Sequence, residues 1–284
     1  MRGMQLHLSC GALGIQASQR EAIELAAAHG FDAVDADGKY LNTLAPGALD
    51  ELAGWMHEKR IVWAMAGLPV EFRKDDATFT SGMAQFPGYA RGLQRAGVRI
   101  VTTYVLPRSD SLTYLQNFHQ HAARLREIAR VLGDSGIRFG IEYVAPKTLW
   151  ATGRYPFVHT MAEMRELIAE MGRPNVGLVL DSWHWYHAGD TTDDIAALPP
   201  DAVVSVDLND APLGVPKDQM VDNHRELPAA TGVIDLRGFL GALEKSGFHG
   251  PVRAEPFNEA VRKMAPAEAA AAAQAALRKA FTGA

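Results

Sequence analysis

The chain has 284 residues, of which 48% are hydrophobic and 21% are charged. This composition is typical of a folded globular protein and excludes the class of disordered chains with low hydrophobicity and high charge. The formal net charge is −5 at pH 7, so no overall positive field would attract a nucleic acid backbone or an anionic membrane. We therefore expect neither nucleic acid nor a membrane as a partner.

The single cysteine and the polar start of the chain bear on its location. Cys10 is the only cysteine, which excludes an internal disulfide and a cysteine-built zinc site and agrees with a reducing compartment. The first residues lack the apolar stretch of a secretory signal, and no continuous apolar run is long enough to cross a bilayer. We expect a cytoplasmic protein.

Short apolar runs alternate eight times with segments of helical periodicity. The predicted strands are, in chain order, residues 6–9, 33–35, 62–67, 100–103, 138–143, 176–181, 203–207 and 251–255. The predicted helices that follow them are residues 19–29, 47–59, 84–96, 114–132, 161–171, 192–198, 235–246 and 265–281. Several helices are predicted to end at a glycine that closes the last turn in a left-handed conformation, namely Gly30, Gly97, Gly133 and Gly247.

This alternation favours one fold over another. Strands and helices that alternate at about 35 residues per unit predict a parallel sheet, and eight units are the number at which such a sheet closes into a (β/α)8 TIM barrel. The alternative is an open doubly wound sheet, but the first strand-to-helix turn, which starts at Cys10, lacks the Gly-x-Gly-x-x-Gly pattern of its phosphate site. No linker divides the chain, so the sequence predicts a single α/β TIM-barrel domain over residues 1–284.

Acidic residues end the last four predicted strands. Active sites of TIM barrels lie at the carboxyl ends of the strands, and each acid here follows mostly apolar residues that would be buried. A single acid at this position could equally be a solvated loop residue or the N-cap of the next helix. Because unpaired buried carboxylates are costly, four in succession favour a shared hard cation such as Mg²⁺ or Mn²⁺. The four acids are Glu142, Asp181, Asp207 and Glu255.

The segments around these acids resemble the xylose isomerase-like barrel superfamily of sugar isomerases and epimerases. The likeness lies in the second half of the chain, in residues 139–143, 175–184, 232–236 and 252–255. The first half matches only in its alternation of strands and helices. In that family a Glu, an Asp, a His and a second Glu from strands five to eight hold one divalent metal, commonly manganese. The resemblance therefore implies a metal ion, with Mn²⁺ favoured over Mg²⁺ and Co²⁺, at Glu142, Asp181, residue 207 and Glu255.

Position 207 departs from the family pattern, because Asp207 stands where the family usually has His. Four carboxylates around a dication carry one more negative charge than three carboxylates and a neutral imidazole. Three interpretations stay open: Asp207 binds the metal, His184 or His224 replaces it as a ligand, or the site has lost its metal. Side chains two residues apart share a strand face, so Arg253 could lie near Glu255 and supply positive charge, or could pair with an unrelated acid.

The resemblance also implies a chemistry. A cation that binds a ketose through two oxygens polarises the carbonyl and stabilises the enediolate left when the α-proton departs. Glu142 and Glu255 would remove and return that proton, unless both are ligands only. His184 and Arg225 match positions that contact substrate in the family, and His224 is a further candidate; a packed imidazole and solvated loop charges are the alternatives. The implied activity is isomerisation or epimerisation of a keto-sugar or keto-inositol.

Several alternatives remain at this stage. A lyase or hydrolase on the same scaffold, such as a dehydroshikimate dehydratase, a keto-sugar hydratase or a deglycosidase, would begin with the same proton removal. A non-catalytic sugar-binding barrel is favoured if Asp207 breaks the site, whereas a DNA repair endonuclease is disfavoured by the net charge and by too few strand-end histidines. Trp63 and Tyr104 could stack on a sugar ring, although core packing is the favoured interpretation of each. The sequence leaves homo-oligomer formation open.

Overall fold

The computed structural model describes residues 3–199 and 201–283. The predicted domain range 1–284 also includes residues 1, 2, 200 and 284, which lie outside the described residues. Within the described part, nine strands form one parallel sheet in the order β3-β2-β1-β11-β10-β9-β7-β5-β4. These strands are β1 (Gln5–Leu8), β2 (Ala33–Val34), β3 (Val62–Trp63), β4 (Ala66–Gly67), β5 (Ile100–Tyr104), β7 (Arg138–Glu142), β9 (Val176–Asp181), β10 (Val203–Leu208) and β11 (Pro251–Ala254).

The sheet closes on itself at the third predicted strand, residues 62–67. β3 and β4 stand at the two ends of the strand order, yet only two residues separate them in the sequence. On one side the Ala64 N–H donates to the Val34 carbonyl at 2.9 Å, and on the other the Leu68 N–H donates to the Thr102 carbonyl at 3.0 Å. β3 and β4 are therefore two parts of one barrel position, and the predicted TIM barrel is confirmed.

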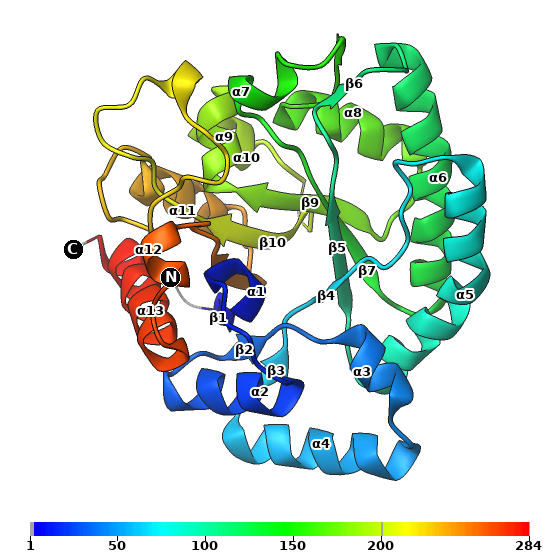
Figure 1. Ribbon diagram of the computed structural model, residues 1–284, viewed down its shortest axis with the longest axis vertical. Helices are drawn as coiled ribbons and strands as arrows, with labels where there is room; N and C mark the ends of the chain where they lie inside the picture. The colour runs from blue at the N-terminus through cyan, green and yellow to red at the C-terminus, as the bar shows by residue number, and fades with distance from the viewer. Residues whose placement is uncertain (1–2, 200, 284) are drawn as a thin grey trace.

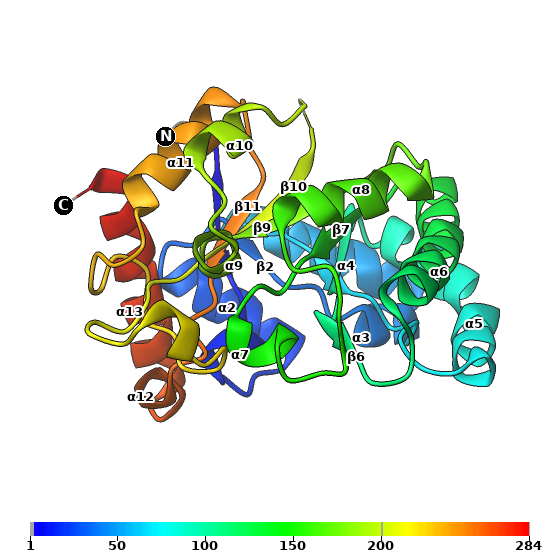
Figure 2. The ribbon, with the colours of Figure 1, turned by 90° about the horizontal axis from the view of Figure 1, so that it is seen from above.

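Helices surround the strands, as Figures 1 and 2 show. Each predicted helix has a counterpart, namely α2 (Gln19–Ala28), α4 (Pro46–Lys59), α5 (Asp76–Arg95), α6 (Tyr114–Asp134), α8 (Met161–Met171), α10 (Thr192–Ala196), α11 (Leu236–Lys245) and α13 (Pro266–Thr282). The segments between them contain short elements that the periodicity did not predict. These are α1 (Cys10–Leu13), α3 (Gly38–Thr43), α7 (Lys147–Trp150), α9 (Ser182–Ala188), α12 (Glu259–Arg262), the 3-10 helix η1 (Lys217–Gln219) and the antiparallel pair β6 (Arg108–Ser109) and β8 (Tyr155–Pro156).

Helix α5 begins eight residues before its predicted start at residue 84. Asp75 caps it, since its Oδ1 accepts a hydrogen bond from the Thr78 N–H at 2.8 Å. Pro87 lies inside this helix. Proline is tolerated in the first turn of a helix but removes a backbone donor further inside it. The sequence pattern therefore favours a helix start close to Pro87.

One of the predicted glycine ends is wrong. Helix α6 runs through Gly133 to Asp134, and the left-handed residue that ends this segment is Gly136, with φ of 66°. The helix continues because its buried face includes Leu132 and Val131, whose packing outweighs the low helix propensity of one glycine. The other three positions are confirmed by their positive φ values, at Gly30, Gly97 and Gly247.

Two of the late strands, β9 and β10, are the longest strands of the sheet, with six residues each. Every residue of β9 and β10 is buried. Their register places Asp207 beside Asp181 on one side and beside Arg253 on the other. The apolar packing of these strands therefore fixes the positions of Asp181, Asp207 and Arg253 at the mouth of the barrel. Among the described helices, none combines the length and apolar character needed to cross a membrane.

Candidate functional site

The four acids of the late strands lie together at the carboxyl ends of those strands. Glu142 ends β7, Asp181 ends β9, Asp207 lies near the end of β10 and Glu255 follows β11. Each offers one carboxylate oxygen that lies within 4.8 Å of the other three. The barrel therefore brings together all four residues that the sequence predicts as metal ligands.

Asp181 is both a helix cap and a member of this cluster. Its Oδ1 accepts hydrogen bonds from the Trp183 N–H and the Asn209 Nδ2, both at 2.8 Å, and so caps α9. Its Oδ2 accepts a hydrogen bond from the Arg225 Nη1 at 2.7 Å. The side chain is fully buried, so these bonds fix the orientation of the carboxylate.

The buried side chain of Arg225 connects two acids of the cluster to the loop after β10. Its Nη1 also donates to Glu255 Oε2 at 3.2 Å, and its Nη2 donates to Asp222 Oδ1 at 2.9 Å. The rings of Trp183 and Phe257 lie 5.5 and 4.7 Å from the guanidinium carbon. Phe257 has an unusual backbone φ of 39°. We attribute this strain to the contact, because strained backbone persists only where its surroundings hold it.

Arg253 makes a second set of charged contacts on the other side of the cluster. It donates from Nε and Nη2 to the two oxygens of Asp207, both at 2.7 Å, and from Nη2 to Glu255 Oε1 at 2.7 Å. The predicted contact between Arg253 and Glu255 is therefore present. Both oxygens of Glu255 face a guanidinium, and so do both oxygens of Asp207.

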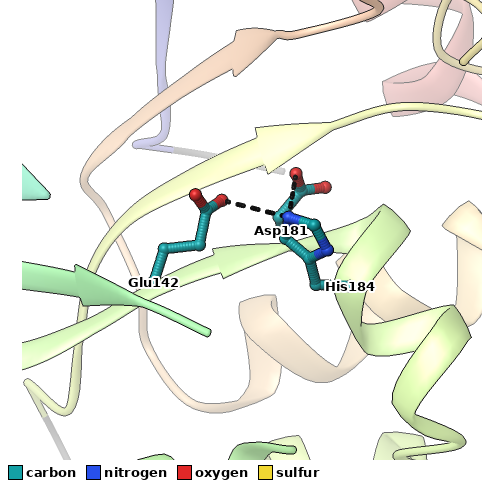
Figure 3. A group of neighbouring side chains, drawn as sticks. All are labelled: Glu142, Asp181 and His184. Carbon is teal, nitrogen blue, oxygen red and sulfur yellow. Dashed lines mark ion pairs between the residues drawn. The ribbon is translucent and has the colours of Figure 1, made fainter. Parts of the chain in front are cut away.

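Glu142 differs from the other three acids. Its Oε1 is buried and has no hydrogen-bond partner among the described residues. Figure 3 shows this carboxylate pointing toward His184, whose Nε2 lies 3.9 Å from Glu142 Oε1 and 3.8 Å from Asp181 Oδ2. An unsatisfied buried acceptor of this kind calls for a cation, a proton or a ligand.

His184 presents Nε2 to the cluster because its other ring nitrogen is occupied. The Ala145 N–H donates to Nδ1 at 3.2 Å, so Nδ1 carries no proton and the neutral ring carries its proton on Nε2. Burial, and then the charge of Arg225, lower the pKa of His184 well below its usual value. The Arg225 Nη2 lies 3.4 Å from Nε2 and donates one of its two N–H groups to Asp222 at 2.9 Å. The shorter bond from the Ala145 backbone N–H, at 3.2 Å, decides the tautomer. We therefore interpret His184 as a neutral hydrogen-bond donor to the site.

The electrostatics of the cluster favour a bound cation. Burial, followed by the charges of Glu255, Asp181 and Asp207, raises the pKa of Glu142 well above its usual value. Burial also raises the pKa of Asp181 to about 6 and that of Glu255 to about 8, although arginines oppose both shifts. If all four acids are ionised, the two guanidinium groups leave a charge of two negative units. Either protons or one divalent cation would neutralise it.

The cluster lies at one side of a cavity of about 450 Å³. Glu142, His184 and Arg225 contribute polar groups, and the apolar lining includes Leu149 and Phe257. This combination of an apolar wall and a few convergent polar groups is typical of small-molecule sites.

Tyr104, Trp63 and His224 lie in three different environments. The expected core packing of Tyr104 is wrong: its side chain is 46% exposed and lines the cavity, where the guanidinium carbon of Arg73 lies 4.3 Å from the ring. Trp63 packs against the core, and its Nε1 donates to the Ala96 carbonyl at 2.9 Å. His224 is exposed and lines a neighbouring cavity, so the structure does not bring it into the carboxylate cluster.

The sequence interpretation missed three residues that shape the site. Asn209 orients Asp181, Asp222 binds Arg225, and Phe257 packs against the same guanidinium. Asn209 stands two residues after Asp207, so strand periodicity could have indicated it. Asp222 and Phe257 reach the site through loop conformations, which leave no periodic signal in the sequence.

Comparison with known proteins identifies the family. The family model described as "Xylose isomerase-like TIM barrel" matches residues 23–280. The chain belongs to the xylose isomerase-like TIM barrel family. A solved xylose isomerase domain protein from Alicyclobacillus acidocaldarius is 31% identical, with a TM-score of 0.86 over 98% of each chain. The IOLI protein, solved with a bound zinc atom, has the same fold, with a TM-score of 0.82, 22% identity and 99% of each chain covered.

Two curated relatives of this xylose isomerase-like chain have different activities. The 3-dehydroshikimate dehydratase of Pseudomonas aeruginosa is 33% identical over 105 residues, which are 37% of this chain and 17% of that protein. The inosose isomerase of Bacillus subtilis is 31% identical over 115 residues, which are 39% of this chain and 40% of that protein. The matched segments therefore cover less than half the length of each of these curated relatives.

Proposed function

We propose that the protein is a divalent-metal-dependent isomerase or epimerase that acts on a keto-sugar or keto-inositol by intramolecular proton transfer. The observation that carries this proposal is the cluster of four acids beside a cavity, with the unpartnered Glu142 carboxylate among them. Its family is one of sugar isomerases and epimerases, and the similarity to inosose isomerase agrees with a cyclitol substrate.

The residues present fit a divalent cation. Glu142, Asp181 and Glu255 would hold it, and Asp207 is the fourth acid of the predicted ligand set. The donors are carboxylate oxygens, which suit Mn²⁺, Mg²⁺ and Co²⁺, and Mn²⁺ is the ion that the family resemblance favours. The zinc atom in the IOLI structure supports a divalent ion on this scaffold. A cation bound here would polarise a substrate carbonyl.

Glu142 and Glu255 are the proposed proton-transfer groups. Glu142 has an oxygen free of hydrogen bonds, and a cation held by the cluster would keep its carboxylate ionised, so that it could accept a proton from a carbon next to a carbonyl. Glu255 has a pKa of about 8 and can hold a proton near neutral pH. One of the two acids would thus remove a proton and the other would return one.

The remaining polar groups of the cavity would bind and orient the substrate. His184 presents its Nε2 proton toward the cavity, where it can donate to a substrate oxygen. Arg225 lines the same cavity and is held by its carboxylate partners. His224 stays a proposed contact of an extended substrate, because it lines the adjacent cavity on the other side of Arg225.

Exchange of substrate hydrogen with solvent deuterium tests this function. Keto-inositols, ketohexoses and 3-keto-glycosides are incubated in D₂O with the protein and Mn²⁺, and each is followed by NMR and mass spectrometry. We expect deuterium to enter the position next to the carbonyl without release of water or an aglycone. Absence of exchange for all three substrate classes, from protein shown to contain metal, would contradict the proposal.

A dehydratase is the second candidate, because the similarity to 3-dehydroshikimate dehydratase is of the same order as that to inosose isomerase. Dehydroshikimate carries a carboxylate, yet the two guanidinium groups among the cavity-lining residues, those of Arg225 and Arg253, are already paired with acids. This favours an uncharged substrate. Incubation with 3-dehydroshikimate distinguishes a dehydratase from an isomerase, because a dehydratase releases water and forms a product with a new double bond.

The proposed partners are small sugars or cyclitols, and the proposed location is the cytoplasm. The location is proposed because Cys10 is the single cysteine of the sequence, which agrees with a reducing compartment.

A further inference from the structure

Asp207 occupies the position at which the family resemblance places a metal ligand, but both of its oxygens are bound to an arginine. Asp207 Oδ1 accepts from the Arg253 Nε and Oδ2 accepts from the Nη2, each at 2.7 Å. Two parallel bonds of this kind form the strong bidentate pair between a guanidinium and a carboxylate. The register of β10 and β11 sets Asp207 and Arg253 side by side, so the pair is built into the sheet.

The other acids of the cluster are placed differently. Glu142 has an oxygen without a hydrogen-bond partner, and Arg225 bonds to one oxygen each of Asp181 and Glu255. Only Asp207, among these four, devotes both oxygens to one guanidinium. Its side chain is fully buried, and the Arg253 side chain is 16% exposed. Turning Asp207 toward a metal would break this buried pair and leave Arg253 with Glu255 as its one bonded carboxylate among the four acids, which is costly.

We propose that Asp207 anchors Arg253 and is not a metal ligand, so that Glu142, Asp181 and Glu255 hold the cation. The anchored guanidinium donates to Glu255 Oε1 at 2.7 Å and thereby orients that carboxylate. Arg253 is thus a positioning residue. The inference rests on the proposed function, because it names the residues that hold the metal of that function.

Mn²⁺ binding to paired variants tests the proposal. The dissociation constant is measured by titration calorimetry for the wild type, Asp207→Asn, Arg253→Gln and the double variant, with Asp181→Asn as the control for loss of a ligand. Asp207→Asn removes one of the two carboxylates that neutralise Arg253, so more positive charge remains beside the metal, and binding should weaken about 10–100-fold, as changes next to metal ligands do. Adding Arg253→Gln should recover most of the lost affinity, since the pair is then neutral, and the remaining deficit of up to about threefold to tenfold reflects the lost orientation of Glu255.

The double variant distinguishes Asp207 as an anchor of Arg253 from Asp207 as a metal ligand. If Asp207 is a ligand, Arg253→Gln cannot restore binding, and the double variant stays as weak as Asp207→Asn. That result would overturn the proposal. Asp181→Asn should lose most of its Mn²⁺ binding whether or not Arg253 is changed.

Thermal unfolding in EDTA tests the anchor without metal. Each single substitution breaks the buried pair and should lower the melting temperature by roughly 5–10 °C, while the double variant should lose less than the sum of the two shifts. Additive shifts would overturn the anchor. If the wild type binds no Mn²⁺, the metal part of the proposed function fails, and the melting temperatures still decide whether the two residues act as a unit.

Discussion

The two halves of the barrel use charge differently. In the first half the His7 Nε2 in β1 and the Asp35 Oδ1 after β2 lie 2.8 Å apart, and β2, β3 and β4 have two residues each. In the second half β9 and β10 have six buried residues each, and four acids meet two arginines. Longer, better buried strands hold costly charges in fixed positions, so we place the chemistry in the second half.

Neutralising one acid in each half tests most strongly whether the chemistry depends on the second half. Glu142→Gln removes the proposed base with little change in shape, and deuterium exchange into the substrate should fall at least about 100-fold. Glu255→Gln should have a similar effect. Asp35→Asn is the control in the first half. Its charge interacts with that of Arg253, but it is not one of the four clustered acids, so its exchange rate should fall far less than that of Glu142→Gln. Equal losses in Asp35→Asn and Glu142→Gln would show that the halves do not differ as proposed.

Stability as a function of pH distinguishes the halves without a substrate. The pKa of Glu255 is raised from 4.5 to about 8 and that of Asp181 from 3.8 to about 6. Below pH 6.5 an effect in the opposite direction comes from the lowered pKa values of His121, His184 and His187. From pH 6.5 to 8 the folded protein still holds the proton of Glu255 while the unfolded chain does not, so the free energy of unfolding should fall as the pH rises. Urea unfolding in EDTA measures this slope. Glu255→Gln should reduce the slope and Asp35→Asn should leave it unchanged; a metal-free protein whose stability rises through this range would contradict the prediction.

A smaller effect is expected at His184. His184→Gln removes the imidazole whose Nε2 faces the cavity, and one lost hydrogen bond to substrate should reduce kcat/KM by roughly 2–10-fold. Steady-state kinetics on a substrate found in the exchange screen measure this. Because the residue is buried, circular dichroism has to show that the variant is folded. A loss as large as that of Glu142→Gln would point to direct participation of His184 in proton transfer.

The smallest effect is expected at the cavity wall. Tyr104 comes from the first half of the chain and is half-exposed at the cavity. Tyr104→Leu should raise KM by about two- to fivefold through lost stacking on the substrate while kcat stays close to that of the wild type. A large fall in kcat would show that the first half contributes to the chemistry.

Features that depend on local patterns are predicted from the sequence, whereas features that depend on the pairing of distant strands are not. The predicted strand 176–181 coincides with β9, because its apolar run ends sharply at Asp181. The contact of Arg253 with Glu255 follows from the alternation of side chains along a strand. The bidentate pair with Asp207 depends on the register between two strands, and a single sequence does not encode that register in any local pattern.

Other features depend on tertiary contacts that leave no local signal. The exposure of Tyr104 results from the position of the loops around the cavity, since an aromatic residue at a strand end is equally compatible with a core position. Phe257 reaches Arg225 through a backbone conformation that is rare for residues other than glycine. Contacts of this kind shape the cavity, and periodicity and spacing do not predict them because they join residues far apart in the sequence.

The central claim is that the acids of the second half hold a divalent cation, and one titration tests it directly. Metal-free protein is titrated with Mn²⁺ at pH 7 in a weakly buffered solution, and bound metal and released protons are measured together. The account predicts a single ion per chain and a release of protons, because Glu142, whose pKa is raised well above its usual value without metal, must give up its proton when the cation binds. A protein that binds no Mn²⁺ and releases no protons at millimolar metal would contradict it.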